Sequence, residues 1–321
     1  MTLAVYLGAW LLDGLFGDPV NWPHPIRWIG WLTSKCEKLA RRVCQSRTAL
    51  YAAGAIVWLV VVSVAGVGCW ALLELLGMIH PMLRLVAELW LGFTTLAGRC
   101  LRDSAYAVIN PLKCGDIETS RVMLSYIVGR DTKALDEPQI CRATVETVAE
   151  NSVDGVIAPL FYLFLGGVPL AMAYKAINTL DSMLGYNNLK YREIGFVSAK
   201  VDDLANYLPA RFGWLLLSVS ACLLKLNTKA AFRVGWRDRY NHKSPNSAWS
   251  EATVAGALGV RLGGPNFYFG QMVEKPWIGD EINTIAPKHV ELACRLMLTA
   301  SALALVVFST VWFVVQSLNG A

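Results

Sequence analysis

The stretch TALYAAGAIVWLVVVSVAGVGCWALL, which runs from Thr48 to Leu73, carries no charged side chain. A helix needs about 20 mostly apolar residues to cross the hydrocarbon core of a bilayer, so this stretch is long enough to span a membrane. A second charge-free stretch runs from Leu296 to Ala321 and meets the same requirement. These two stretches predict membrane-spanning helices and decide the fold class.

Shorter apolar stretches accompany the two long ones. The stretches 1–12 and 212–224 carry no charge but are short for a full crossing. The stretch 83–97 contains two charged residues, which favours a re-entrant or interfacial position. The sequence therefore predicts an all-α fold, a polytopic integral membrane protein with about four to six hydrophobic helices.

The stretch 155–174 is also charge-free, but Gly166-Gly167-Val168-Pro169 interrupts it. Such a break is tolerated at membrane depth where irregular backbone lines a polar cavity. If 155–174 crossed the membrane once, the polar segments 99–154 and 175–211 would lie on opposite faces and would not share a water-soluble substrate. We therefore expect a broken helix or helical hairpin at 155–174.

The composition agrees with a membrane protein. The chain is 55% hydrophobic and 17% charged, against about 25% charged residues in soluble domains. No Pro/Gly/Ser-rich linker divides it, so we expect a single polytopic membrane domain, residues 1–321. The net charge of +5 is dispersed and does not indicate a nucleic-acid partner. The clearest basic cluster lies within 27–47, between two apolar stretches, as in a cytoplasmic loop.

Several common signatures are missing from the sequence. The eight cysteines form no C-x-x-C pair and have no histidine partner at zinc spacing, so we assign them neither a metal nor a disulfide. There is no G-x-x-x-x-G-K-[ST] phosphate loop, no G-x-S-x-G elbow and no H-E-x-x-H zinc motif. Gly66 and Gly68 imitate a dinucleotide fingerprint, but they lie inside an apolar stretch without a flanking strand.

Three carboxylates share one predicted helix face. Glu146, Glu150 and Asp154 are spaced four residues apart, and like charges at this spacing destabilise an isolated helix. A bound cation such as Mg²⁺, which favours carboxylates together with phosphate oxygens, would compensate. The alternative is an exposed acidic stripe paired with scattered arginines. Carboxylates beside an apolar segment are costly, which favours a site.

A second polar group follows the interrupted stretch. It consists of Asn178 and Asp181, then the pair Asp202-Asp203, and then Arg211. Adjacent carboxylates repel each other unless a bound metal or a neighbouring arginine compensates. A charge pair stabilised by the dipole at a helix N-terminus explains Asp202-Asp203 equally well, so both explanations stay open.

Arginines and a histidine gather in two further segments. The first contains Arg130 and Asp131, and the second reads WRDRYNHKSPN, residues 236–246. Arginine is the side chain best suited to bidentate contacts with phosphate or carboxylate. His242 among such neighbours is typical of an anion ligand, although a surface-loop histidine also explains it. We expect the second segment to bind an anion through Arg237, Arg239, His242, Ser244 and Asn246.

These segments occur together, and in order, in a known family. The matching blocks are Gly17-Asp-Pro19, Trp22-Pro-His-Pro25, Ile29-Gly30, Phe93-Thr-Thr-Leu-Ala97, Ile127-Val-Gly-Arg-Asp-Thr132, Glu146-Thr-Val-Ala-Glu-Asn-Ser-Val-Asp-Gly155, Asn178-Thr-Leu-Asp-Ser-Met183, Asp202-Asp203, Pro209-Ala-Arg211 and His242-Lys-Ser-Pro-Asn246. With them the sequence resembles the adenosylcobinamide-phosphate synthases of cobalamin biosynthesis, the CobD/CbiB family.

The resemblance implies an ATP-dependent ligase. It would join the free propionate of adenosylcobyric acid to the amine of an aminopropanol O-phosphate, or a close analogue, as an amide. A carboxylate is a poor acyl donor, so an acyl phosphate formed from ATP is the natural intermediate. The resemblance further implies Mg²⁺ with ATP, a multi-pass location in a bacterial inner membrane, and other membrane-bound cobalamin-assembly enzymes as partners besides the lipid bilayer. Because ATP is cytoplasmic, we expect the polar segments to face the cytoplasm.

The expected roles follow from residue type and from the matched blocks. We expect Arg130 and Arg211 to bind the ATP phosphates, and Arg237, Arg239 and His242 to bind the amino-alcohol phosphate. The catalytic candidates are Glu146, Glu150, Asp181 and His242. The further binding candidates are Asp131, Asn178, Ser244 and Asn246, and the metal candidates are Glu150, Asp154, Asp202 and Asp203.

Two other functions compete with this one. Paired acidic motifs with Mg²⁺ also serve membrane-embedded transferases of the prenyltransferase type, but those enzymes do not need the Arg/His/Ser-Pro-Asn block. A corrinoid transporter would use the interrupted stretch 155–174 as its midplane site. Against it, the ionisable clusters lie outside the apolar runs, and no inverted repeat is visible.

Overall fold

The computed structural model describes residues 3–18, 22–268 and 270–319. Pro19 of the Gly17-Asp-Pro19 block, Met1 and Thr2 of the first apolar stretch, and Gly320 and Ala321 of the last one lie outside the described residues. The eight cysteines are free, as the sequence predicts.

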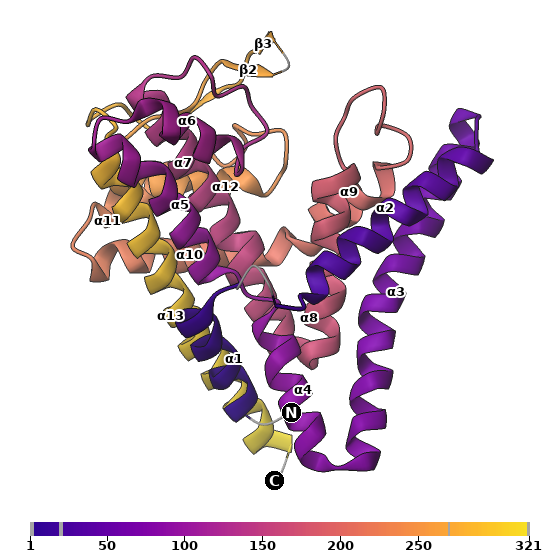
Figure 1. Ribbon diagram of the computed structural model, residues 1–321. Coiled ribbons are helices and arrows are strands. Elements are labelled where there is room, and N and C mark those ends of the chain that lie inside the picture. Colours follow the sequence, from indigo (N-terminus) through magenta and orange to yellow (C-terminus); the bar gives the residue numbers. More distant parts are fainter. Residues whose placement is uncertain (1–2, 19–21, 269, 320–321) are drawn as a thin grey trace. The chain divides into compact units, whose positions relative to one another are not determined.

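The chain forms two compact units (Figure 1). Unit 1 comprises Met1–Ala97, Ala158–Asn206 and Val307–Ala321, and unit 2 comprises Gly98–Ile157 and Tyr207–Val306. The expectation of one domain over 1–321 remains a prediction. Each unit contains segments from distant parts of the sequence, because the chain passes between the units more than once.

Unit 1 is built from helices, most of them apolar, together with the charge-rich helix α2. They are α1 (Leu3–Phe16), α2 (Pro25–Val43), α3 (Arg47–Ile79), α4 (Pro81–Phe93), α8 (Ala158–Leu184), α9 (Phe196–Ala205) and the end of α13 (Pro287–Asn319). α3 buries a stripe at four-residue spacing, including Val57, Val61 and Ala65, against the rest of the unit. Its other faces expose large apolar side chains such as Leu59 and Val67. Such a surface suits contact with lipid rather than water.

The predicted break in 155–174 is present in α8. Gly166 and Gly167 have non-helical backbone angles, and Gly167 has a φ of +70°, which favours glycine. The rings of Tyr162 and Tyr174 stack with their centroids 4.8 Å apart. In a continuous helix these residues would be about 18 Å apart. The chain therefore reverses at Gly166-Gly167, and the expected broken or hairpin helix is confirmed.

The all-α polytopic fold class is confirmed by the helices. Within the described residues, three helical segments are long and apolar enough to cross a membrane: Arg47–Ile79, Glu137–Leu184 and Pro287–Leu318. Leu3–Phe16 and Tyr207–Leu223 are shorter apolar helices. By length and composition alone Glu137–Leu184 counts as one span, but its reversal inside α8 means that it is not a straight crossing.

Unit 2 carries most of the polar segments. Its helices are α5 (Gly98–Lys113), α6 (Ile117–Ser125), α7 (Glu137–Ser152), α10 (Tyr207–Leu223), α11 (Thr228–Arg237), α12 (Ser247–Leu258) and the first part of α13, and a π-helical turn, η1 (Val153–Ile157), follows α7. Asp136 and Gln139 form a capping box that starts α7. α11 and α12 pack tightly, because a Cβ at Gly256 would lie 2.4 Å from the Ala230 carbonyl oxygen.

Four short strands follow α12. β1 (Leu262–Gly263) pairs antiparallel with β4 (Trp277–Ile278), and β2 (Asn266–Tyr268) pairs antiparallel with β3 (Gln271–Val273). The sequence analysis did not predict these strands. They fold the segment 262–278 over α7 and α12, since β1 contacts both helices and β4 contacts α12.

Candidate active site

Charged side chains from distant segments of unit 2 meet around a cavity of about 160 Å³, which we call the polar cavity. α7 contributes Glu146 and Glu150, α12 contributes Glu251, and the loop after α11 contributes His242. The segments before α7 and around the short strands add two cations, Arg130 and Lys275. Three carboxylates therefore face one small volume together with basic groups.

Glu146 is held on both of its carboxylate oxygens. Oε2 forms an ion pair with the Arg130 guanidinium, and Oε1 accepts a hydrogen bond of 2.7 Å from the backbone N–H of Gly263. Gly263 has a φ of +73°, and a Cβ there would lie 2.5 Å from the Pro276 carbonyl oxygen. Arg130 also donates to Asn266 Oδ1 at 3.0 Å. The pair is buried, so it fixes the 262–266 segment against α7.

Glu150 lies one turn further along α7. Its Oε1 accepts a hydrogen bond of 2.9 Å from the Ser247 hydroxyl, which comes from the first turn of α12. Within the described residues Oε2 has no hydrogen-bond partner, so this oxygen remains available to a ligand of the polar cavity. The π-helical turn η1 begins three residues later, and such turns in α-helices are frequent at functional sites.

Glu251 and Lys275 line the polar cavity but were not among the residues predicted from the sequence. The Glu251 side chain is buried in α12, where it is the one charged residue among apolar and small neighbours. Burial raises the pKa of the Glu251 carboxyl well above its usual range, and the nearby charges of Glu150 and Glu146 raise it further. A lone glutamate inside SAWSEATVAGAL is the signal that points to it.

His242 faces the cavity as a neutral imidazole. Burial lowers the pKa of His242, and the charge of Lys275 lowers it further, against the opposing effect of Glu150. The backbone N–H of Ser244 donates to His242 Nδ1 at 3.0 Å. In the neutral ring the proton therefore sits on Nε2, which makes Nε2–H a donor. Lys275 Nζ donates to the Tyr268 hydroxyl at 2.8 Å.

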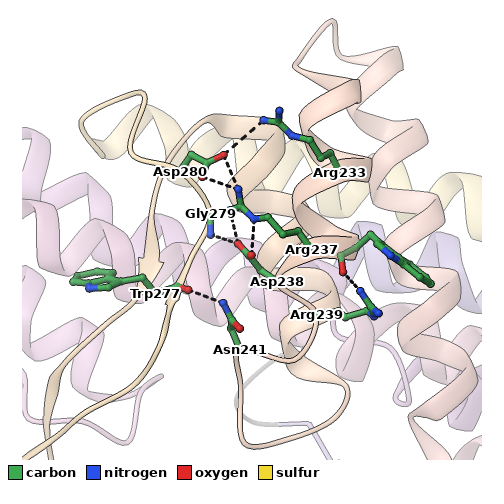
Figure 2. Close-up of polar contacts among 9 residues, drawn as sticks. Arg233, Arg237, Asp238, Arg239, Asn241, Trp277, Gly279 and Asp280 are labelled. Atoms are coloured by element: carbon green, nitrogen blue, oxygen red, sulfur yellow. Dashed lines mark hydrogen bonds and ion pairs between the residues drawn. The ribbon is translucent and has the colours of Figure 1, made fainter.

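An ion-pair cluster, shown in Figure 2, fixes the loop that carries His242. Arg237 binds both Asp238 and Asp280, with N–O distances of 2.7 and 2.9 Å. Asp238 also accepts a hydrogen bond of 2.8 Å from the Gly279 backbone N–H. Asn241 donates to the Trp277 carbonyl oxygen at 2.9 Å. The end of α11 is thereby tied to the chain around β4, which lies next to Lys275. We call this cluster the Arg237 clamp.

The remaining residues of the 236–246 segment have structural partners. Arg211 donates to Asn246 Oδ1 at 2.7 Å, and Ser244 Oγ accepts from the Asn246 backbone at 3.2 Å. The Arg239 guanidinium lies 4.0 Å from the centre of the Trp236 ring and donates to the Trp236 carbonyl oxygen. Phosphate binding by Arg211, Arg237 and Arg239 remains a prediction.

Other predicted site residues do not line the polar cavity. Asp131 accepts from the Gly270 backbone at 2.7 Å and so anchors the β2–β3 hairpin. Asp154 belongs to η1 in unit 2. Asn178, Asp181, Asp202 and Asp203 belong to unit 1, where Asp202 accepts from Asn206 at 3.0 Å and Asp203 lies 3.6 Å from Lys200.

Across residues 3–18, 22–268 and 270–319, no group of three or more His, Cys, Asp or Glu side chains is arranged to hold a metal ion. The roles predicted for Glu150, Asp154, Asp202 and Asp203 as metal ligands therefore remain predictions.

The geometry can be set against known proteins. The sequence matches the family described as CobD/Cbib protein over residues 6–297. The chain belongs to the CobD/CbiB family. The matched residues include the whole lining of the polar cavity.

Full-length relatives carry the same family name. The chain is 58% identical to the cobalamin biosynthesis protein CobD of Klebsiella pneumoniae, over 96% of this chain and 97% of that protein. It is 56% identical to the cobalamin biosynthesis protein CbiB of Salmonella typhi, over the same shares of the two chains. No solved structure matches the chain. The CobD/CbiB relationship supports a role in cobalamin biosynthesis.

Proposed function

We propose that this CobD/CbiB protein is an ATP-dependent carbon–nitrogen ligase. It joins the free propionate of adenosylcobyric acid to the amine of an aminopropanol phosphate, or a close analogue, and gives adenosylcobinamide phosphate. The observation that carries the proposal is the polar cavity, where Glu150, Glu251, His242 and Lys275 converge from four segments. Acyl transfer to an amine needs both anion-binding and proton-accepting groups, and the cavity offers both.

The reaction proceeds in two balanced steps. A propionate oxygen attacks the γ-phosphorus of ATP, the bond to ADP breaks, and an acyl phosphate forms. The amine then attacks the acyl carbon, inorganic phosphate leaves with the original propionate oxygen, and the nitrogen loses a proton. The protein contributes positioning and charge stabilisation, which dominate catalysis of phosphoryl transfer.

Two donors suit the phosphoryl group. Lys275 carries a positive charge into the polar cavity, and His242 Nε2–H adds a neutral hydrogen-bond donor. Both groups line the polar cavity, where they can bind oxygens on which charge develops during transfer. Arg130 is already neutralised by Glu146, so its part is to hold the cavity wall. Glu150, with one free oxygen, accepts the proton of the attacking amine.

Mg²⁺ accompanies ATP in such ligases and neutralises phosphate charge when it is bound. Mg²⁺ commonly takes only one or two carboxylates and completes its shell with phosphate oxygens and water. Glu251 lines the polar cavity and would provide one such carboxylate, while Glu150 accepts the proton of the amine. A cation there would also offset the repulsion that, together with burial, raises the pKa of Glu251. The residues present therefore fit the ion.

The surroundings of the reaction form part of the proposal. We propose a multi-pass location in a bacterial inner membrane, with the polar segments facing the cytoplasm, where ATP is available. Three long apolar helical segments and the α8 hairpin support this topology. Other membrane-bound enzymes of cobalamin assembly are proposed as partners, since the corrinoid passes between consecutive steps.

The test is a reconstituted reaction with purified protein, adenosylcobyric acid, aminopropanol phosphate and Mg-ATP. Mass spectrometry of the corrinoid and release of inorganic phosphate are measured together. Glu150→Gln is expected to lower turnover by roughly 10²- to 10⁴-fold, as loss of a general base does. Glu118→Gln, a matched change at a side chain that is 77% exposed in α6, should leave it unchanged. Equal turnover of both variants, or transport without amide formation, would contradict the proposal.

A further inference from the structure

A second cavity of unit 2, about 260 Å³ in volume, is not used by the proposed chemistry. It shares two elements with the polar cavity. Arg142 lines it from α7, one turn before Glu146, and Trp277 lines it from β4, between two residues of the polar cavity. Its polar lining includes Gln139, Arg142, Arg261, Asn283 and Thr284. We call it the arginine pocket.

Arg142 is a mostly buried cation that makes no ion pair with any described residue, although the charges of Glu146 and Asp136 lie near it. Its Nε is buried and has no hydrogen-bond partner among the described residues. The contact that it does make is with the Trp277 ring, whose centre lies 5.1 Å from the guanidinium carbon. A cation–π contact stabilises the face of a guanidinium but leaves its N–H edge unsatisfied. Such a buried N–H edge is costly unless a ligand accepts from it.

Arg261 places a second guanidinium on the same ring. Its guanidinium carbon lies 4.2 Å from the centre of the Trp277 ring. Arg261 pairs with Glu281 at 2.6 Å, but the Glu281 side chain is 61% exposed, so solvent weakens that pair. The other carboxylate of the lining, Asp136, is engaged as the N-cap of α7. Two like charges on one indole repel each other, and an oxyanion bound between them relieves that repulsion.

We propose that the arginine pocket binds the phosphate group of the aminopropanol phosphate. Two planar guanidinium forks match the geometry of a phosphate, and the amide of Gln139 adds a donor. The volume of about 260 Å³ accommodates a small phosphate ester. Because α7 and β4 line both cavities, a molecule anchored here by its phosphate lies beside the carboxylates of the polar cavity.

This inference rests on the proposed function for the identity of the ligand, and it differs from the sequence-based expectation for that phosphate. Arg237 already binds two carboxylates, and Arg239 is stacked on Trp236 and bonded to its carbonyl oxygen. Arg142, by contrast, makes no ion pair with any residue that the structure describes. Arg142 in the arginine pocket is therefore better placed to bind a further anion than Arg237 or Arg239.

Isothermal titration of the full-length protein in detergent tests the pocket without any turnover. The probes are aminopropanol phosphate, inorganic phosphate and phosphate-free aminopropanol. Arg142→Gln and Arg261→Gln should each weaken binding of both phosphate probes by at least about tenfold, as loss of a charge-assisted hydrogen bond does. Arg142→Lys keeps the charge but loses the fork, so it should recover only part of the affinity. Lys229→Gln, on the exposed face of α11, is the matched loss of charge and should have no effect.

Unchanged phosphate affinity in folded Arg142→Gln and Arg261→Gln would overturn the inference. If these variants instead lose affinity for a non-hydrolysable ATP analogue and bind aminopropanol phosphate as the wild type does, the assignment of the pocket to aminopropanol phosphate is wrong. Thermal unfolding checks the fold, and Arg261→Gln carries the test if Arg142→Gln does not fold. The test of the pocket is separate from the test of the proposed function. If the wild type ligates but phosphate binding does not depend on Arg142, only the pocket is refuted. If the pocket binds phosphate but the protein forms no amide, only the ligase is refuted.

Discussion

At the scale of single residues, the three glutamates that line the polar cavity differ in the partners that their carboxylates bind. Glu146 is fully engaged by Arg130 and Gly263, whereas Glu150 keeps one oxygen available. Glu251 is buried beside both, and burial together with the charges of Glu150 and Glu146 raises the pKa of its carboxyl. We propose three different tasks for these glutamates: Glu146 holds the structure, Glu150 accepts a proton and Glu251 provides a ligand for a cation.

Glu251 gives a prediction about pH. Its pKa in the folded protein lies above the ordinary glutamate value, so the folded state binds more protons than the unfolded state in the window between the two values. The free energy of unfolding must therefore fall as pH rises through that window. Glu251→Gln should remove this slope and be at least as stable as the wild type at high pH, in metal-free buffer. Thermal unfolding across that pH range, with Glu118→Gln as control, measures it. A Glu251→Gln slope identical to that of the wild type would contradict the assignment.

The sequence predicted part of this site. Arg130, Glu146, Glu150 and His242 were recognised from residue type and from the family blocks, and the structure brings them to one cavity. Glu251 and Lys275 belong to no recognised spacing, because the contacts that place them come from α12 and the short strands. Non-local packing of that kind leaves no local pattern in the sequence.

At the scale of elements, glycines and ion pairs decide how the segments are joined. The reversal of α8 depends on Gly167 at positive φ, and it was predictable because Gly-Gly-x-Pro breaks an apolar helix. The strands β1 to β4 were not predictable from periodicity, since each has only two or three residues. Their pairing depends on partners elsewhere in the chain, such as Glu146 for Gly263.

Two glycine substitutions should have opposite effects. Gly167→Ala forces a side chain into a backbone region that L-residues rarely adopt, and should destabilise the protein by about 1 kcal/mol. Gly68→Ala lies inside α3, where a Cβ would meet no atom within 4 Å. It should be neutral or stabilise by up to about 1 kcal/mol. Thermal or denaturant unfolding in detergent compares them, and an equally stable Gly167→Ala would contradict the reversal.

The Arg237 clamp leads to a prediction about the loop 238–246. Arg237→Gln leaves Asp238, whose pKa is held low by Arg237 and the Gly279 N–H against the opposing effect of burial, without its main cation. The loop should then open and be cleaved faster in limited proteolysis, and turnover should fall. Lys229→Gln on the same helix should change neither. A rise in the KM for aminopropanol phosphate alone, with unchanged proteolysis, would instead favour direct phosphate binding by Arg237.

At the scale of the whole molecule, the fold class was the most predictable feature. Long charge-free stretches predict membrane helices directly. The CobD/CbiB blocks indicate the family from the sequence alone. The division into two compact units was not foreseen, because each unit combines segments that are far apart in the sequence. Composition cannot show it when no linker separates the segments.

The α8 hairpin predicts the sidedness of the polar segments. Lys133 before α7 and Leu189 after α8 should face the same side of the membrane, since the chain between them turns back at Gly166-Gly167. Both residues are exposed. Single cysteines at these positions, in a background free of the native cysteines, should react alike with an impermeant maleimide in oriented vesicles. Labelling from opposite sides would contradict the hairpin topology.

The central claim is that unit 2 forms an amide through an acyl phosphate. The most direct measurement uses adenosylcobyric acid labelled with ¹⁸O in its free propionate, together with aminopropanol phosphate and Mg-ATP. The account predicts that one labelled oxygen appears in inorganic phosphate for each corrinoid amide formed, and that Glu150→Gln lowers both products in parallel. Amide formation with unlabelled phosphate, or with the label in AMP, would contradict it.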